Sequence, residues 1–252
     1  MDFETITVEN SGAVGLITLN RPASMNAVCA AMMYELAEAV KAFDAEETIR
    51  VVVLKGREEF FAAGTDMSEF AAVQNDVDGA KGLYANSVRT IAACSKPIVS
   101  AVAGYAFGGG LELVLLSDIV IAADNARFGF PEITLGVLPQ MGGVSMLTSR
   151  IGRAKAADLL LTGRHIGAEE ALACGLVSRV VDVTALLSEV EETAKRIADM
   201  PAVGVRLVKR AVLNACELKN EENIALLSLM SADAKEGVAA LKENRAPKFG
   251  NK

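Results

Sequence analysis

The chain has 252 residues, of which 52% are hydrophobic, and a formal net charge of −7. This length and composition suffice for the core of one globular domain, and no uninterrupted apolar run reaches the length of a membrane-spanning helix. The acidic balance, without any run of Lys or Arg, argues against binding to nucleic acid or to an anionic membrane surface. We therefore expect neither nucleic acid nor a membrane among its partners.

Residues that often build metal centres or hydrolytic triads are sparse. The four cysteines lie far apart in apolar or helical runs, which fits neither a metal site nor a disulfide framework. We expect the single histidine, His165, to be structural, since it lies at an expected helix end, where such side chains bind backbone carbonyls. The scattered cysteines fit a reducing compartment, and the chain does not open on a basic segment followed by an apolar one, so we expect a cytoplasmic protein. We also expect no metal, because of the cysteine spacing and the single histidine, and no other cofactor.

The first part of the chain predicts short strands and one helix. Residues 5–8 and 14–19 have the pattern of a β-hairpin, and an Asn-Arg-Pro segment ends the second strand. Apolar residues recur at helical spacing over 27–43, and 51–54 form a continuous apolar run typical of a buried parallel strand. The apolar loop 59–70 follows at the carboxyl end of that strand, where open α/β folds bind ligands.

The remaining chain continues as α/β and then becomes helical. The polar, irregular residues 71–77 predict a mobile lid, and 135–143 form a loop punctuated by glycines. Apolar runs predict strands at 98–102, 119–123 and 177–181. The predicted helices are 79–94, 144–150, 153–161 and 169–174. Residues 184–242 contain no strand pattern, so we expect a separate helical region there.

A glycine cluster lies between an apolar strand and a short apolar helix. Gly108, Gly109 and Gly110 let a ligand approach the backbone without a Cβ in the way. The unpaired N–H groups and the positive dipole end of the helix suit a developing negative charge, as in an oxyanion hole. Glu112 and Glu132 add two carboxylates in apolar surroundings, which is typical of acid/base chemistry. The structural alternative is that the glycines only allow tight packing and that the helix dipole stabilises Glu112.

Five motifs follow one another along nearly the whole chain. They are residues 20–27, 61–66, 103–112, 128–136 and 236–249. In this order they resemble the crotonase superfamily, also called the enoyl-CoA hydratase/isomerase family. The resemblance implies an α/β fold, with a crotonase-like spiral of β-β-α turns over residues 1–183 and an all-helical oligomerisation region over 184–252. It also implies assembly into a homotrimer or a hexamer.

The resemblance further implies an acyl-CoA thioester as substrate, so that coenzyme A arrives as part of the substrate. The backbone N–H groups of Thr65 and Gly109 would bind the thioester oxygen. Glu112 would hold and activate a water and Glu132 would deliver a proton, which adds water across the 2,3 double bond of a trans-2-enoyl thioester. The positions expected around the adenine and pantetheine parts are Met25, Ala27, Ala63, Asp66, Met67 and Ser68.

Two positions depart from the usual hydratase pattern. Gln140 follows Pro139 where hydratases commonly have the first glycine of Gly-x-Gly-Gly, and its side chain is a candidate substrate contact. Ser68 stands where many hydratases have a lysine near the adenine. Two other functions stay open: another crotonase-type acyl-CoA enzyme, such as an enoyl-CoA isomerase or acyl-CoA hydrolase, and a non-catalytic RNA-binding or scaffolding relative. The intact pair of glutamates and the net negative charge argue against the non-catalytic alternative.

Overall fold

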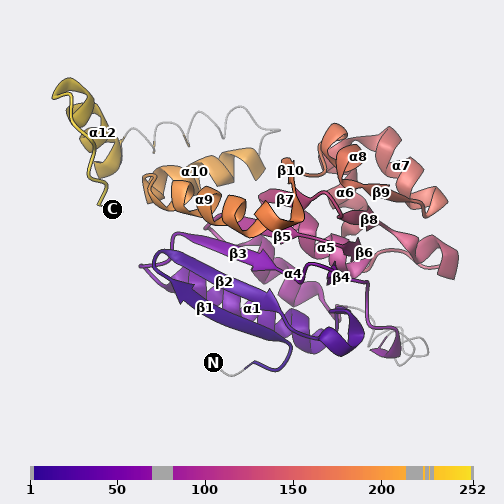
Figure 1. Ribbon diagram of the computed structural model, residues 1–252. Coiled ribbons are helices and arrows are strands. Elements are labelled where there is room, and N and C mark those ends of the chain that lie inside the picture. The colour runs from indigo at the N-terminus through magenta and orange to yellow at the C-terminus, as the bar shows by residue number, and fades with distance from the viewer. Residues whose placement is uncertain (1–2, 70–81, 214–223, 225–226, 228–229, 251–252) are drawn as a thin grey trace.

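The computed structural model describes residues 3–69, 82–213, 224, 227 and 230–250, and its strands form two sheets (Figure 1). The larger sheet has the order β1 (Ile6–Ser11), β2 (Val14–Leu19), β3 (Val51–Lys55), β5 (Ile98–Val102), β7 (Ile119–Ala123) and β10 (Arg179–Val181). The smaller sheet has the order β4 (Phe60–Ala62), β6 (Tyr105–Phe107), β8 (Arg127–Gly129) and β9 (His165–Gly167). Neighbouring strands are parallel except in the β1–β2 and β8–β9 pairs.

Three successive turns of the chain repeat one β-β-α path. In each turn the first strand joins the larger sheet and the second joins the smaller one, as β3 and β4, β5 and β6, then β7 and β8. This is the spiral that the family resemblance implied. Because β4, β6 and β8 are parallel neighbours, the loops that follow them leave the same edge of the smaller sheet.

Helices cover both faces of the larger sheet. Because successive side chains of a strand point to opposite faces, Val52 and Leu54 of β3 join one apolar cluster and Val51 and Val53 join another. Figure 1 shows α1 and α9 on opposite sides of this sheet. The helices that precede β10 in the described chain are α1 (Ala30–Ala45), α4 (Ala85–Ala92), α5 (Gly109–Leu115), α6 (Gly143–Ile151), α7 (Arg153–Thr162) and α8 (Ala168–Ala173).

The last part of the chain is helical where the structure describes it. Its helices are α9 (Leu186–Ala198), α10 (Ala202–Leu213) and α12 (Ala232–Lys242). Leu186, Val190 and Ala194 pack α9 against the larger sheet, so the first helix of this region lies on the core. The boundary at residues 183 and 184 stays a prediction. Within the described part of the chain, no helix combines the length and apolar character needed to cross a membrane.

The structure corrects several expected boundaries. The first helix begins at Ala30 instead of 27, because Val28 forms a β-bridge with Thr65 and Cys29 caps the helix. The strand expected at 5–8 extends to Ser11. The helix expected at 79–94 is described only as α4, and the strand expected at 177 starts at Arg179. The expected lid at 71–77 lies outside the described residues.

The sequence analysis also missed three short strands and misplaced His165. The strands β4, β8 and β9, each of three residues, were not predicted. His165 does not lie at a helix end: it opens β9, and its ring stacks on Phe107 with the ring centroids 4.1 Å apart. This contact gives His165 a packing role in the smaller sheet.

Candidate active site

Three loops meet at the edge of the smaller sheet where β4, β6 and β8 end. The loop after β4 holds Thr65, the turn after β6 holds Gly108 and Gly109, and the 3-10 helix η2 (Pro131–Leu135) after β8 holds Glu132. The N–H of Gly108 donates to the carbonyl of Gly129 at the end of β8 at 2.9 Å. The spiral thus brings together residues that are far apart in the sequence.

Two glycines in the middle turn are required by close contacts. Gly108 has φ +46°, a left-handed conformation that favours glycine, and a Cβ there would collide with Oε1 of Glu132. A Cβ on Gly109 would lie 2.7 Å from Oγ1 of Thr65. Thr65 and Glu132 therefore both lie against this turn, and a larger residue at either glycine would displace them.

Unpaired backbone donors lie at the same place. Gly109 is the first residue of α5, and among the residues that the structure describes neither its N–H nor that of Thr65 has a hydrogen-bond partner. Gly109 is buried and Thr65 is half-buried. Because a buried N–H without a partner costs free energy, a ligand oxygen that accepted both bonds would be stabilised here.

Glu112 lies in the first turn of α5 and is 0% exposed. Its Oε1 accepts hydrogen bonds from the N–H groups of Met141 at 2.7 Å and Gly143 at 2.8 Å. Burial raises the pKa of Glu112 to about 7; the bonds from Gly143 and Met141 oppose this shift, and the charge of Glu132 adds to it. Its Oε2 is buried and has no partner among the described residues.

Glu132 is the second carboxylate of the site. It is half-buried in the first turn of η2, and burial raises its pKa above the ordinary value. Like Glu112, it has a buried Oε2 without a partner within the described ranges. Two carboxyl groups with raised pKa values, each with an oxygen that no described residue bonds, can share a water or a proton.

The burial of Glu112 gives a prediction for stability. Between pH 4.5 and about 7 the folded protein holds a proton on Glu112 that the unfolded chain releases, so the free energy of unfolding falls as the pH rises through this window. The shift corresponds to about 3 kcal/mol above pH 7. We expect Glu112→Gln, which cannot ionise, to stabilise the protein at pH 8 and to have little effect at pH 4. Denaturant unfolding at a series of pH values measures this, and an identical pH dependence in both proteins would contradict it.

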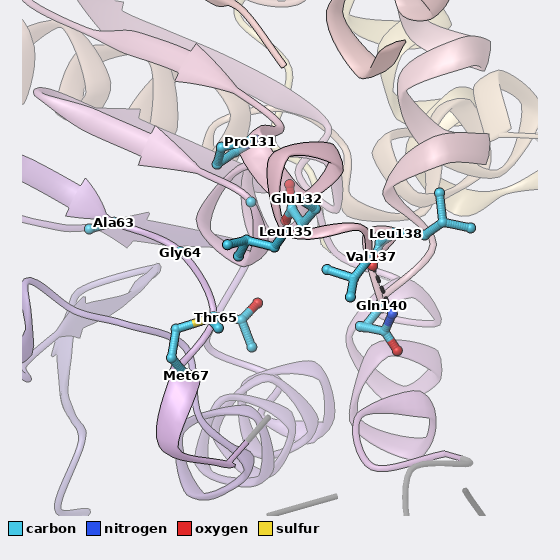
Figure 2. A pocket seen from close by; sticks show the side chains of 11 residues that line it. Ala63, Gly64, Thr65, Met67, Pro131, Glu132, Leu135, Val137, Leu138 and Gln140 are labelled. Carbon is cyan, nitrogen blue, oxygen red and sulfur yellow. Dashed lines mark hydrogen bonds between the residues drawn. The ribbon is translucent and has the colours of Figure 1, made fainter. Parts of the chain in front are cut away.

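A cavity of about 200 Å³ opens between the three loops (Figure 2). The residues that line it are Ala63, Gly64, Thr65, Met67, Gly108, Pro131, Glu132, Leu135, Val137, Leu138 and Gln140. Five of the expected site residues are among them. The other six expected residues are not part of the lining: Gly109, Glu112, Met25, Ala27, Asp66 and Ser68. Within the described residues no group of three His, Cys, Asp or Glu side chains comes together as a metal site.

Known proteins resemble this chain over its full length. The sequence model of the family described as enoyl-CoA hydratase/isomerase matches residues 9–252. The chain belongs to the enoyl-CoA hydratase/isomerase family. A Rhizobium meliloti protein named "Probable enoyl-CoA hydratase" is 44% identical over 255 residues, which is 99% of each chain. A Mycobacterium bovis protein named "Probable enoyl-CoA hydratase echA8" is 45% identical over 258 residues, again 99% of each.

The fold is shared with solved structures of the family. The crystal structure of "Enoyl-CoA Hydrates Subunit I" from Geobacillus kaustophilus covers all of both chains with a TM-score of 0.95 and 39% identity. The crotonase-like fold predicted from the sequence is therefore confirmed.

Two loops of the region expected to hold coenzyme A in this family run side by side. The N–H of Ala63 donates to the carbonyl of Met25 at 3.0 Å. Met25 has φ +48° and is 51% exposed, so its side chain lies on the surface. The buried Asn26 beside it donates Nδ2 to the carbonyl of Phe61 at 3.0 Å. Asn26, for which no role was predicted, therefore holds the first loop against β4.

An ion pair also joins these loops. Nη2 of Arg21 lies 2.9 Å from Oδ2 of Asp66, and its Nη1 donates to the carbonyl of Ala27. Oδ1 of Asp66 accepts a bond from the hydroxyl of Ser68 at 2.6 Å. The bonds from Ser68 and Arg21 lower the pKa of Asp66. In this family member Asp66 and Ser68 thus hold the conformation of the loop, and the neighbouring Met67 is 53% exposed.

Gln140 is exposed at the rim of the cavity. Its Nε2 donates to the carbonyl of Leu138 at 2.7 Å, and Figure 2 shows the amide turned back onto its own loop. Its Oε1 has no partner among the described residues. The side chain thus lies at the site while one of its donors is already used.

Sequence reasoning missed the groups that hold Glu112 and part of the cavity wall. The donors from Met141 and Gly143 are backbone groups, which any residue type can supply, so no side chain signals them. The Gly142-Gly143 pair was the one visible sign of a close approach in this loop. The structure explains the second glycine, since a Cβ on Gly143 would lie 2.9 Å from Oε1 of Glu112. The apolar residues between Glu132 and Gln140 were visible in the sequence, but nothing there indicated that they face the site.

Proposed function

We propose that the protein is an enoyl-CoA hydratase, which adds water across the 2,3 double bond of a trans-2-enoyl-CoA and needs no cofactor beyond the coenzyme A of its substrate. The observation that carries this proposal is the pair of buried carboxylates, Glu112 and Glu132, each with one oxygen free of protein partners among the described residues. The N–H groups of Thr65 and Gly109, which have no partner in the described part of the chain, support it, and so do the names of the relatives.

The proposed reaction begins with the thioester oxygen bound by the N–H groups of Thr65 and Gly109. A water bound to the free oxygens of Glu112 and Glu132 attacks C3 of the substrate. Its oxygen forms the new bond, one of its protons passes to Glu112, and the π electrons move to form an enolate on the thioester. The two N–H groups stabilise this negative charge.

Collapse of the enolate completes the addition. The enolate electrons re-form the thioester carbonyl, and C2 takes a proton from Glu132. The proton on Glu112 then returns to Glu132 before the next cycle. Because the charge of Glu132 raises the pKa of Glu112, the two groups titrate as a pair, and near neutral pH one of them can be the base while the other is the acid.

A mass-spectrometric assay tests the function directly. We expect incubation with a trans-2-enoyl-CoA to give a product that has gained the mass of one water. An isomerase would leave the mass unchanged while moving the double bond, and a hydrolase would release free coenzyme A. Either of these results, or no reaction with any enoyl-CoA, would contradict the proposal.

Gln140 gives a prediction for specificity. A hydrogen bond from its amide to the acyl group would raise kcat/KM for polar or cyclic acyl groups relative to plain chains. A site built to bond a polar group penalises substrates that lack it. We expect Gln140→Gly to lower kcat/KM for a hydroxylated or cyclic enoyl-CoA relative to crotonyl-CoA by roughly 10-fold. Kinetics of both substrates with both proteins measure this ratio, and an equal ratio would remove Gln140 from substrate selection.

We also propose that the helices after residue 184 form a homotrimer or hexamer. Where the structure describes them, these helices expose large apolar side chains, including Val208 at 64%, Val212 at 68% and Leu241 at 82%. Apolar surface of this kind is typical of interfaces between permanently associated subunits. We expect light scattering at micromolar concentration to give the mass of a trimer or its multiple. A stable, active monomer would contradict this.

A further inference from the structure

The direction of the Thr65 N–H is set by one β-bridge. Thr65 pairs in parallel with Val28. The N–H of Val28 donates to the carbonyl of Gly64, and its carbonyl accepts from the N–H of Asp66, both at 2.8 Å. The carbonyl of Gly64 and the N–H of Thr65 belong to one trans peptide group, in which they point in opposite directions. The bond to Gly64 therefore turns the N–H of Thr65 away from Val28.

The side chain of Arg21 joins the two segments of this bridge. Its Nη1 donates to the carbonyl of Ala27, the residue before Val28. Its Nη2 lies 2.9 Å from Oδ2 of Asp66, the residue after Thr65. Because the guanidinium is a rigid planar fork, it fixes both partners relative to each other in a way that a single point charge does not.

Arg21 is itself held in place. Its N–H donates to Oδ1 of Asn26 at 2.8 Å, and its carbonyl accepts from the N–H of Asn26 at 2.9 Å. The side chains of Arg21 and Asp66 are 24% and 18% exposed, so water and salt screen this ion pair less than one on the open surface. The pair therefore ties the loop after β4 to a fixed anchor.

We propose that Arg21 is a positioning residue for the oxyanion donor of Thr65, an inference that rests on the proposed hydratase function. Through Ala27 and Asp66 it keeps the bridge between Val28 and Thr65 in register, and so keeps the N–H of Thr65 aimed at the thioester oxygen. Such a donor stabilises the enolate only when it points to where the charge forms. A displacement of about 1 Å can cost roughly 100-fold in rate.

A direct contact with the phosphates of coenzyme A is the alternative role for Arg21. Both of its Nη atoms are bonded inside the protein, and the carboxylate of Asp66 compensates its charge. To bind a phosphate, the guanidinium would have to leave these partners. The two roles differ in kinetics: a group that aims a transition-state donor affects kcat, whereas a group that binds the coenzyme A part equally in all states affects KM.

Kinetics of Arg21 variants are the first test. Arg21→Gln removes the charge and the fork, and we expect kcat for hydration of crotonyl-CoA to fall about 10- to 100-fold with little change in KM. Arg21→Lys keeps the charge but not the fork, so it should restore only part of kcat. Arg179→Gln is the matched control, because it removes an ion pair with Glu189 from β10 and should leave kcat and KM unchanged.

The carbonyl band of a bound thioester reports on the donor itself. Butyryl-CoA labelled with ¹³C at the carbonyl has no double bond to hydrate, so isotope-edited infrared spectroscopy can record it on every variant. A hydrogen bond to the carbonyl oxygen weakens the C=O bond and lowers its stretching frequency. We expect the bound band to lie below that of free butyryl-CoA in the wild type and in Arg179→Gln, and to move back toward the free value in Arg21→Gln.

A rise in KM alone, with kcat and the carbonyl band unchanged, would assign Arg21 to coenzyme A binding and overturn the inference. A lower kcat with an unchanged band would also overturn it, because the loss would then arise elsewhere. If Arg21→Gln does not fold, Asp66→Asn should shift kcat and the band in the same direction, and unchanged values there would contradict the role of the pair. A wild type that hydrates no enoyl-CoA would defeat the proposed function, while the band of bound butyryl-CoA would still decide the role of Arg21.

Discussion

Replacing either Glu112 or Glu132 by Gln is expected to slow hydration of an enoyl-CoA by roughly 10²–10⁴-fold in kcat. Gln has nearly the shape of Glu, and its carbonyl oxygen can still accept the bonds that Met141 and Gly143 give to Oε1 of Glu112. It can neither take a proton from water nor release one to C2. The loss therefore reports on proton transfer more than on the structure of the site. Turnover of a saturating enoyl-CoA measures it.

The double variant separates a shared role from two independent ones. If both carboxylates act on the same water, the second substitution removes little that the first has not already removed, so the combined loss is much smaller than the product of the two. Strict multiplicativity would show that they act independently. If only one substitution slowed the reaction, an isomerase or hydrolase with one working acid would explain the site better.

A matched control is available on another helix. Glu191 of α9 is exposed and far in the sequence from the three loops of the site. Glu191→Gln removes the same charge from the protein and should leave kcat unchanged. Thermal unfolding of every variant at pH 8 shows whether each is folded, and at that pH Glu112→Gln should melt no lower than the wild type.

The parts of the fold that could be predicted are those with a local pattern. The strands β5 and β7 are continuous apolar runs, and the structure has them at the expected residues. The strands β4, β8 and β9 have three residues each and exist because they pair with distant segments, as Phe60 does with Tyr105. Their formation depends on tertiary contacts, which a local sequence pattern does not contain.

The same distinction holds for the site. Glu112 and Glu132 could be singled out because carboxylates in apolar runs are unusual. That Oε1 of Glu132 would lie against Gly108, and that Asn26 would be buried against Phe61, depends on how the turns of the spiral stack. The start of α1 was misplaced for the same reason: the bridge between Val28 and Thr65 holds residues that have a helical pattern in an extended path.

Removing the N–H of Gly109 is the second change that we expect to slow hydration strongly. Gly109 is the first residue of α5, the position in which proline fits best because no helical hydrogen bond is lost there. Gly109→Pro removes the donor but also adds a Cβ, which would lie 2.7 Å from Oγ1 of Thr65. We therefore place the substitution in a Thr65→Ala background, which removes that oxygen and keeps the N–H of residue 65.

In that background we expect Gly109→Pro to raise the barrier to hydration by about 3 kcal/mol, which is roughly a 100-fold loss in kcat. Gly109→Ala in the same background is the control, because it adds the Cβ near Met141 and Val28 but keeps the N–H. A donor aimed at the enolate oxygen acts in the transition state, so the loss should appear in kcat more than in KM. Equal turnover of the Pro and Ala variants would show that the thioester oxygen is not bound by Gly109.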